Sequence, residues 1–374
     1  MDVELEPALQ GLVDKVQATR ASRGTLVIQG GDSKRFYGNP TRGELLDMRS
    51  LSGVSSYEPS ELVVTARAGT PLVELEALLA EQNQCLAFEP PRFASAGNAG
   101  IAGGTVGGMV AAGLSGPSRV SAGALREHVL GATLLNGKGE VLSFGGQVMK
   151  NVAGYDVSRL LAGSLGVLGA ICEVSLKVMP RPAASATLRF EMDQAEALQV
   201  LNHRAGQPLP LSASAWWEGM LVLRLAGAVA AVGAAAHKLG GEAIEPTMAA
   251  AFWDGLRDQT DEYFVGARRA VEGAATLWRL SLPQTTAPLQ LSGQQLIEWG
   301  GAQRWLCSSL PAGAVRDAAA AVGGHATLFM GLDRSAGVFA PLKSPLDRIH
   351  RELKRAFDPD GVFNPGRLYQ GLCP

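Results

Sequence analysis

Cysteine and histidine are scarce in this sequence. The 374 residues include four cysteines, with no C-x-x-C pair, and five histidines, with no two at metal-ligand spacing. Structural zinc sites, iron-sulfur clusters and disulfide frameworks all need several suitably spaced ligands or thiols. We therefore expect no metal site and no cluster in this chain. Its cysteines are Cys85, Cys172, Cys307 and Cys373.

Charge is also sparse, and no lysine/arginine block occurs. Charged residues make up 18% of the chain and the formal net charge is -2, so a nucleic-acid surface is not indicated. The N-terminus, MDVELEPALQ, lacks the basic and apolar regions of a secretory signal. We expect a cytoplasmic protein, with possible association with the inner face of the membrane through a complex.

The common nucleotide and hydrolase fingerprints are missing. A G-x-G occurs at Gly137 and Gly139, but Leu142 stands where the third glycine of a dinucleotide fingerprint would be. G-x-x-x-x-G-K-[ST], H-E-x-x-H and G-x-S-x-G do not occur. These absences argue against a doubly wound dinucleotide fold, a P-loop nucleotidase and the usual zinc and serine hydrolases.

Glycine, in contrast, is concentrated between residues 97 and 116. This stretch reads GNAGIAGGTVGGMVAAGLSG, and eight of its twenty residues are glycine. It lies in 26 uncharged residues between Arg92 and Arg119, but so many glycines make a poor membrane span. Backbone N–H groups in such a loop, followed by a helix starting near Thr105, can bind phosphate without a lysine. A tight turn that serves only the fold is the alternative.

A second loop of this kind follows the expected strand Thr25–Gln29. It reads Gly30, Gly31, Asp32, Ser33, Lys34 and offers backbone donors and a hydroxyl to an anion. Taken alone, a plain hairpin turn explains it nearly as well. Two such loops together predict a bipartite phosphate site.

The remaining pattern predicts an α+β protein. The first region has a helix near residues 5–20, a strand at 62–66, a helix at 72–82 with Thr70 as cap, a hairpin around residues 136–139, and a strand at 171–178 with one buried face. Prolines at 180 and 182 then interrupt the chain. Beyond them, a β-α-β-β-α order between residues 187 and 239 suits a ferredoxin-like sandwich.

Several segments resemble a known family. IQGGDSK, the glycine-rich segment, GALREHVLG, KNVAGYDVSRLLAGSLGVLGAI and the terminal FDPDGVFNPGRL are similar to the vanillyl-alcohol-oxidase (PCMH-type) FAD-binding proteins. EWGGAQRWL and GGHATLF resemble more closely the second flavin subunits of bacterial glycolate oxidase (glycolate dehydrogenase), which are FAD-binding proteins of this superfamily. The resemblance covers nearly the whole chain. It implies a two-subdomain FAD-binding domain at 1–182, an α+β cap domain at 183–340, and a helix and tail at 341–374 that return to the FAD domain.

The resemblance also implies a set of FAD contacts, with residues 30–34 as the first pyrophosphate loop and residues 97–108 as the second. The cofactor is expected to be non-covalent, because Asp32 follows Gly31 where some relatives have a histidine, and no His or Cys lies between Phe93 and Ala124. Backbone donors would neutralise a diphosphate for which no cluster of Lys or Arg is available. The implied contacts are Gly30, Gly31, Asp32, Ser33, Lys34, Ala96, Gly97, Gly104, Thr105, Val106, Gly107, Gly108, Arg126, Gly166, Ile171 and Asn364.

Three functions fit these features. The first is an FAD-binding subunit of a multi-subunit dehydrogenase that oxidises glycolate to glyoxylate, with a second flavin subunit and an iron-sulfur subunit as partners. The second is a non-catalytic FAD subunit for electron transfer or assembly, and the third is a stand-alone FAD oxidase. Oxidation of a 2-hydroxy acid needs a base and a cation, for which His325 and Arg304, and after it Arg279 or Arg334, are candidates by residue type. A purely structural role is the alternative for each of them.

Overall fold

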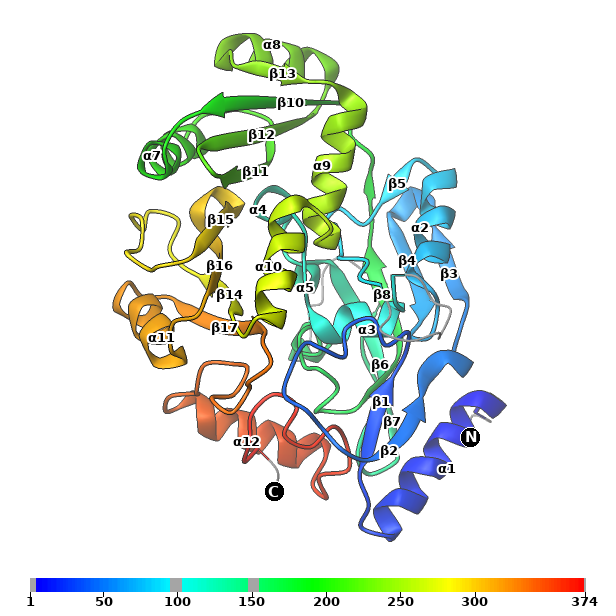
Figure 1. Cartoon of the computed structure of the whole chain (residues 1–374). Helices are drawn as coiled ribbons and strands as arrows, with labels where there is room; N and C mark the ends of the chain where they lie inside the picture. Colours follow the sequence, from blue (N-terminus) through cyan, green and yellow to red (C-terminus); the bar gives the residue numbers. More distant parts are fainter. Residues whose placement is uncertain (1–4, 95–102, 147–154, 373–374) are drawn as a thin grey trace.

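The computed structural model describes residues 5–94, 103–146 and 155–372. The chain folds around two large β-sheets (Figure 1). The first sheet has five strands in the order β3-β4-β8-β6-β7. The strands of this region are β1 (Leu26–Gln29), β2 (Glu44–Asp47), β3 (Val54–Glu58), β4 (Val63–Arg67), β5 (Gln84–Cys85), β6 (Val129–Leu135), β7 (Val141–Gly145), β8 (Ala170–Lys177) and β9 (Met179–Pro180). β1 and β2 form a separate parallel pair, and β5 pairs with β9.

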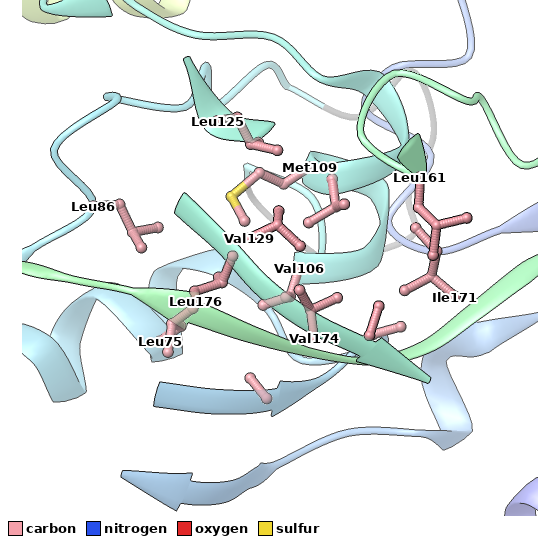
Figure 2. Packing of buried hydrophobic residues seen from close by; sticks show 14 of the residues in the cluster. Leu75, Leu86, Val106, Met109, Leu125, Val129, Leu161, Ile171, Val174 and Leu176 are labelled. Carbon is pink, nitrogen blue, oxygen red and sulfur yellow. The ribbon is translucent and has the colours of Figure 1, made fainter. Parts of the chain in front are cut away.

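Helices cover this first sheet and connect its strands. They are α1 (Pro7–Ala21), α2 (Leu72–Glu81), α3 (Val106–Ala112), α4 (Arg119–Ala122), α5 (Leu125–His128) and α6 (Val157–Leu160). Figure 2 shows how α3 lies on the sheet, with Val106 and Met109 among Val129, Val174 and Leu176. These five side chains are buried. Their packing fixes α3 on the sheet, and with it the glycines that precede and begin the helix.

The second sheet has eight strands, in the order β13-β10-β12-β11-β15-β16-β14-β17. Its strands are β10 (Ala184–Glu191), β11 (Leu211–Trp217), β12 (Met220–Gly227), β13 (Glu242–Ile244), β14 (Thr276–Ser281), β15 (Gln294–Glu298), β16 (Gln303–Ser308) and β17 (His325–Met330). The first four strands have the order expected of a ferredoxin-like unit. The last four repeat this order, and the two halves join where β11 pairs with β15.

Helices lie on both faces of the eight-stranded sheet (Figure 1). α7 (Gln194–Ala205), α8 (Val229–Leu239) and α11 (Ala312–Ala321) pack on one face. α9 (Pro246–Asp258) and α10 (Glu262–Glu272) pack on the other, together with Phe93 and Leu114 of the first region. The α+β class and the ferredoxin-like cap predicted from the sequence are confirmed, although the second half of the sheet was not foreseen beyond single strands.

The C-terminal segment returns to the first region. α12 (Leu346–Phe357) is followed by Phe363, which lies beside Leu26 of β1. The buried ammonium of Lys354 is 2.5 Å from the Asp358 carboxylate, and it donates to the carbonyls of Val167 at 2.8 Å and Phe363 at 2.9 Å. A buried charge with this many partners holds the tail against the first sheet.

Two local expectations were wrong. The Thr70 hydroxyl does not cap α2: it donates to the Gly53 carbonyl at 3.0 Å, and Pro71 is the N-cap residue. β8 is not exposed along the whole of its second face: it is the central strand of its sheet, and Ile171 and Ser175 on that face are buried while Glu173 and Lys177 are half-buried. The domain limits at residues 182 and 340 stay a prediction.

Candidate cofactor site

A cavity of about 700 Å³ lies between β1, the start of α3 and the C-terminal tail. Its size falls in the range of cofactor and small-molecule sites. Eight of the residues predicted to contact FAD from their positions in the two loops line it: Gly30, Gly31, Asp32, Ser33, Lys34, Thr105, Gly107 and Gly108. Gly166, Ile171 and Asn364, predicted from later segments, line it too. The fold thus brings together residues from both ends of the chain.

Glycine allows the two loops to approach each other. A Cβ on Gly30 would lie 2.3 Å from the Thr105 Oγ1, and one on Gly104 would lie 2.5 Å from the Ser33 Oγ. Gly104 also has a φ of +86°, which disfavours any side chain. The space that a Cβ would fill is therefore occupied by a polar atom of the opposite loop. This close packing makes one continuous cradle out of the two glycine-rich loops.

The cradle presents backbone donors. The N–H groups of Asp32, Ser33 and Lys34 donate to no acceptor within the described part of the chain. At the other loop, Thr105 caps α3, its Oγ1 accepting from the Gly108 N–H at 3.4 Å. Backbone N–H groups and the positive end of a helix favour an anion such as a diphosphate. The residues present therefore fit the pyrophosphate of FAD.

Cationic side chains also line the cavity, contrary to the expectation that no cluster of Lys or Arg is available. They are Lys34, Arg35, Arg42, Arg334 and Arg367, with Asp32 as a counter-charge 3.1 Å from Arg35. Lys34 and Arg367 are 333 positions apart. The cluster was missed because the sequence shows only neighbours along the chain, whereas the tail and the segment after β17 bring two of the arginines to the cavity.

Two of these cations are held by backbone carbonyls. Arg334 donates to Gly38 at 2.8 Å, and Arg367 donates to Arg35 at 2.9 Å and Asn39 at 3.1 Å. Burial, and then the charges of Arg334 and Arg35, lowers the pKa of Arg367 to about 10. Since carbonyls leave the charges uncompensated, both guanidiniums raise the positive potential of the cavity.

Lys34 lies next to Phe93, which packs against the eight-stranded sheet. Its ammonium lies 3.3 Å from the Ser33 hydroxyl and 5.6 Å from the centre of the Phe93 ring. Burial lowers the pKa of Lys34 to about 8, and the negative charge of Asp258 opposes that shift. A diphosphate beside this ammonium would favour its charged form.

Asn364 joins the tail to the cavity wall. Its side chain accepts from the Ile28 N–H at 3.0 Å and donates to the Leu165 carbonyl at 2.7 Å. A Cβ on Gly166 would lie 2.7 Å from the Asn364 Nδ2. Asn364 therefore positions β1 against the Gly166 turn, so its side-chain amide is already engaged within the protein.

The remaining predicted FAD contacts fall elsewhere. Val106 begins α3 and is fully buried between that helix and the first sheet, and Gly104 packs against the Ser33 hydroxyl. Arg126 is exposed on α5 and does not line the cavity. Ala96 and Gly97 lie outside the described residues.

The two catalytic candidates do not line the cavity. Arg304 is buried in β16 and donates to the carbonyls of Gly301 at 3.3 Å and Ala287 at 2.8 Å, and also to that of Thr286. Burial lowers its pKa to about 10. His325 begins β17 on the same face of the sheet as Arg279, and partial burial and then that positive charge lower its pKa. Arg304 therefore has the contacts of a structural residue.

Comparison with known proteins agrees with this geometry. Residues 9–145 match the family model described as an FAD binding domain. The chain is 46% identical over 363 residues to the glycolate oxidase subunit GlcE of Escherichia coli (strain K12), a match that covers 97% of this chain and 98% of that protein. It is 30% identical over 150 residues to the glycolate oxidase subunit GlcD of Bacillus subtilis (strain 168), covering 40% of this chain and 30% of GlcD.

The fold is also that of a solved structure at low identity. An alkyldihydroxyacetonephosphate synthase superposes with a TM-score of 0.63 at 15% identity, covering 96% of this chain and 76% of the synthase. At this identity the likeness concerns the fold alone. In the described parts of the chain, no helix has both the length and the apolar character needed to cross a bilayer.

Proposed function

Because this chain belongs to the family of the glycolate oxidase subunit GlcE, whose FAD binding domain it shares, we propose that it is the FAD-binding subunit of a multi-subunit dehydrogenase that oxidises glycolate to glyoxylate. The observation that carries the proposal is similarity along essentially the whole length of both chains. A match confined to the first region would support only the cofactor.

We further propose that the cradle holds the pyrophosphate of FAD. The N–H groups of Asp32, Ser33 and Lys34 contribute backbone donors. Thr105, Gly107 and Gly108 line the same cavity, and the five cations around them offset the diphosphate charge. The cofactor is bound non-covalently, since the cavity lining formed by the described residues contains no histidine or cysteine that could carry a covalent flavin. The Gly166 turn and Ile171 lie further along the dinucleotide.

FAD, when bound, supplies the acceptor for the α-hydrogen of glycolate, which leaves as hydride. The chain has to bind the substrate carboxylate with a cation, accept the hydroxyl proton and exclude water. The face of the eight-stranded sheet that meets Phe93 and Leu114 is where such groups would act, because it lies next to the cavity and is covered by both regions.

Partners follow from the same proposal. Within the described residues, no group of three or more His, Cys, Asp or Glu side chains is arranged to hold a metal. A second flavin subunit and an iron-sulfur subunit would receive the electrons, and the complex would work in the cytoplasm or on the inner face of the membrane.

The test uses the full-length chain loaded with FAD, alone and together with its flavin and iron-sulfur partner subunits. Acid precipitation should release the flavin into the supernatant, because no covalent bond holds it. Glycolate added without oxygen should then bleach the visible flavin band of the isolated chain.

The outcomes separate the three functions. Activity in the complex with an unbleached flavin in the isolated chain would assign the chemistry to the partner and this chain to electron transfer or assembly. Rapid peroxide formation by the isolated chain in air would indicate a stand-alone oxidase. A chain that cannot be loaded with FAD would contradict the cradle itself.

A further inference from the structure

A second, much smaller cavity lies where the cap sheet meets the first region. It is lined from the first region by Phe93 and Ser115, and from the cap by Gln259, Arg279, Glu298 and Phe329, among others. The two regions contribute opposite walls. The residues that line it include Ser115 and Gly116, at the end of the glycine-rich stretch, but none of them lines the large cavity. Phe36, which lines the large cavity, packs against Phe93 and Phe329, which line the small one.

Arg279 brings a positive charge to this cavity. Its guanidinium donates to the Tyr37 hydroxyl at 3.0 Å and lies over the rings of Tyr37 and Phe329, at 5.6 and 5.9 Å from their centres. Its Nε is buried and has no hydrogen-bond partner among the described residues. Arg257, on the same cavity, is instead neutralised by Asp258 at 2.7 Å and Asp254 at 2.8 Å. Arg279 forms no ion pair within the described ranges.

Gln259 brings the complementary group. Its side chain is 4% exposed, and its Oε1, an acceptor, is buried without a partner. Leaving a buried donor or acceptor unpaired is unfavourable. Two unpaired atoms of opposite kind, a donor on Arg279 and an acceptor on Gln259, therefore line the same cavity.

Glu298 is the carboxyl group that lines the same cavity. It is 3% exposed, and its Oε2 accepts from the Trp305 Nε1 at 2.6 Å and the Gln303 Nε2 at 3.0 Å. Burial raises the pKa of Glu298 to about 7. Because part of this carboxyl is protonated near neutral pH, it places less negative charge against an incoming anion than an ordinary glutamate does.

We propose that Arg279 and Gln259 form the subsite that binds a small 2-hydroxy acid, Arg279 donating to the carboxylate and Gln259 accepting from the hydroxyl. This inference rests on the proposed function and deepens it by naming the residues that select its substrate class. The pairing satisfies both orphaned atoms with one ligand. It also matches the aromatic walls, which exclude water and strengthen the ion pair.

The size of the cavity sets a condition on binding. The enclosed space is about 20 Å³, which is room for a water-sized group. A 2-hydroxy acid therefore needs Phe93 and Phe329 to move apart. A bound water is the competing occupant, because water also accepts and donates.

The test measures binding rather than turnover, on the full-length FAD-loaded chain without oxygen. The thermal unfolding midpoint is followed against increasing glycolate and, separately, acetate, which lacks the hydroxyl; the increase in midpoint gives each Kd. Arg279→Gln should weaken glycolate binding about tenfold or more, since a charge-assisted hydrogen bond is lost. Gln259→Met should reduce the preference for glycolate over acetate to about one.

Arg316→Gln is the matched control. Arg316 also has a buried Nε without a partner and lies over an aromatic ring, Trp278, at 5.7 Å, but it sits on α11 at the other face of the sheet. Its variant should bind glycolate like the unchanged chain. If Arg279→Gln is unstable, Arg279→Lys, which keeps the charge and loses the fork, should still weaken binding about threefold or more.

Equal glycolate Kd values in Arg279→Gln and Arg316→Gln would overturn the subsite. It would also be overturned if glycolate did not change the unfolding midpoint of the unchanged chain, and water would then be the occupant of the cavity. The result is separable from that for the proposed function. Arg279-dependent binding without flavin bleaching would support the subsite and contradict catalysis by this chain. Flavin bleaching by glycolate, together with a glycolate Kd that is the same in Arg279→Gln and the unchanged chain, would support catalysis by this chain and contradict the subsite.

Discussion

The two cavities are built from different parts of the polypeptide. The large one is lined by glycines, backbone N–H groups and cations that carbonyls hold in place, whereas the small one between the two regions is lined by side chains. A site made of backbone tolerates little change at its glycines but needs few particular side chains. A site made of side chains depends on one or two of them. The first suits a diphosphate with many acceptors, and the second suits a small ligand with few.

The cations differ in the same way. Arg304 and Arg279 lie on adjacent strands, with Arg304 opposite Leu280 and Arg279 opposite Trp305. Successive residues point to opposite faces of a strand, so the two guanidiniums serve different sides of the sheet. Arg304 donates to the carbonyls of Gly301 and of the loop between β14 and β15, whereas the Arg279 Nε has no partner among the described residues. Whether the guanidinium N–H groups already have acceptors within the protein, rather than the residue type, distinguishes a structural arginine from one that is available to bind a ligand.

The largest effect expected from this comparison concerns Arg304. Arg304→Met should lower the free energy of unfolding by about 4 kcal/mol, because one buried and two partly buried carbonyls lose a charged donor. The same variant should keep the glycolate Kd of the folded chain. Urea unfolding gives the first quantity and the midpoint titration the second.

Arg269→Met is the control for Arg304. Arg269 is exposed on α10, so its loss should change stability by no more than about 0.5 kcal/mol. A loss of glycolate binding in a folded Arg304→Met chain would contradict the structural role and indicate that Arg304 binds the substrate.

Glu298 provides the next effect, which depends on pH. Its pKa in the folded chain is raised to about 7 from an ordinary value of 4.5. Between these values the unfolded chain has lost a proton that the folded chain keeps, so rising pH favours unfolding. Stability should therefore fall between about pH 4.5 and 7, by about 3 kcal/mol in all, and stay lower above pH 7.

Glu298→Gln removes this titration while keeping an acceptor for Trp305. Urea unfolding from pH 5 to 8 measures the free energy of unfolding of both proteins. As the pH rises, the variant should become more stable relative to the unchanged chain. Asp261, whose pKa burial raises to about 6, is present in both proteins. A difference that does not vary with pH would show that Glu298 is ionised throughout.

The sequence predicted the backbone-built site far better than the side-chain-built one. Gly30 and Thr105 could be found because glycines and a capping hydroxyl follow one another along the chain and have few other uses. Arg334 and Arg367 could not be assigned to this cavity, since only the return of the tail places them at β1. In the fold, the ferredoxin-like order was visible as alternating strands and helices. Its repetition was hidden because no helix separates β14 from β15.

Arg279 shows why residue type alone misleads. From the sequence, Arg304 ranked before Arg279 as a candidate carboxylate ligand. What distinguishes Arg279 is an unpaired Nε and a neighbouring unpaired Gln259 Oε1. These properties depend on contacts between residues far apart in sequence, and no spacing rule expresses them.

The backbone-built cavity is tested most directly at Gly104. Gly104→Ala places a Cβ 2.5 Å from the Ser33 Oγ at a φ of +86°, so it should displace the first loop and weaken FAD binding about 100-fold. Fluorescence titration of the FAD-free chain with FAD gives the Kd. Gly11→Ala is the control, because nothing lies within 4 Å of its Cβ in α1. Unchanged FAD binding in a folded Gly104→Ala chain would mean that the two loops do not form a single cradle.

The smallest effect tests whether Lys34 belongs to the same cavity. Burial holds its pKa at about 8, so about half of the ammonium groups are neutral at pH 8 and most at pH 9. FAD binding should raise this pKa and take up close to one proton at pH 9, and much less at pH 7, where Lys34 is already charged. Calorimetric titration in two buffers of different ionisation enthalpy counts that proton. Lys34→Met should abolish the uptake, whereas Lys138→Met, at an exposed hairpin turn, should keep it; equal uptake in both would place the diphosphate away from Lys34.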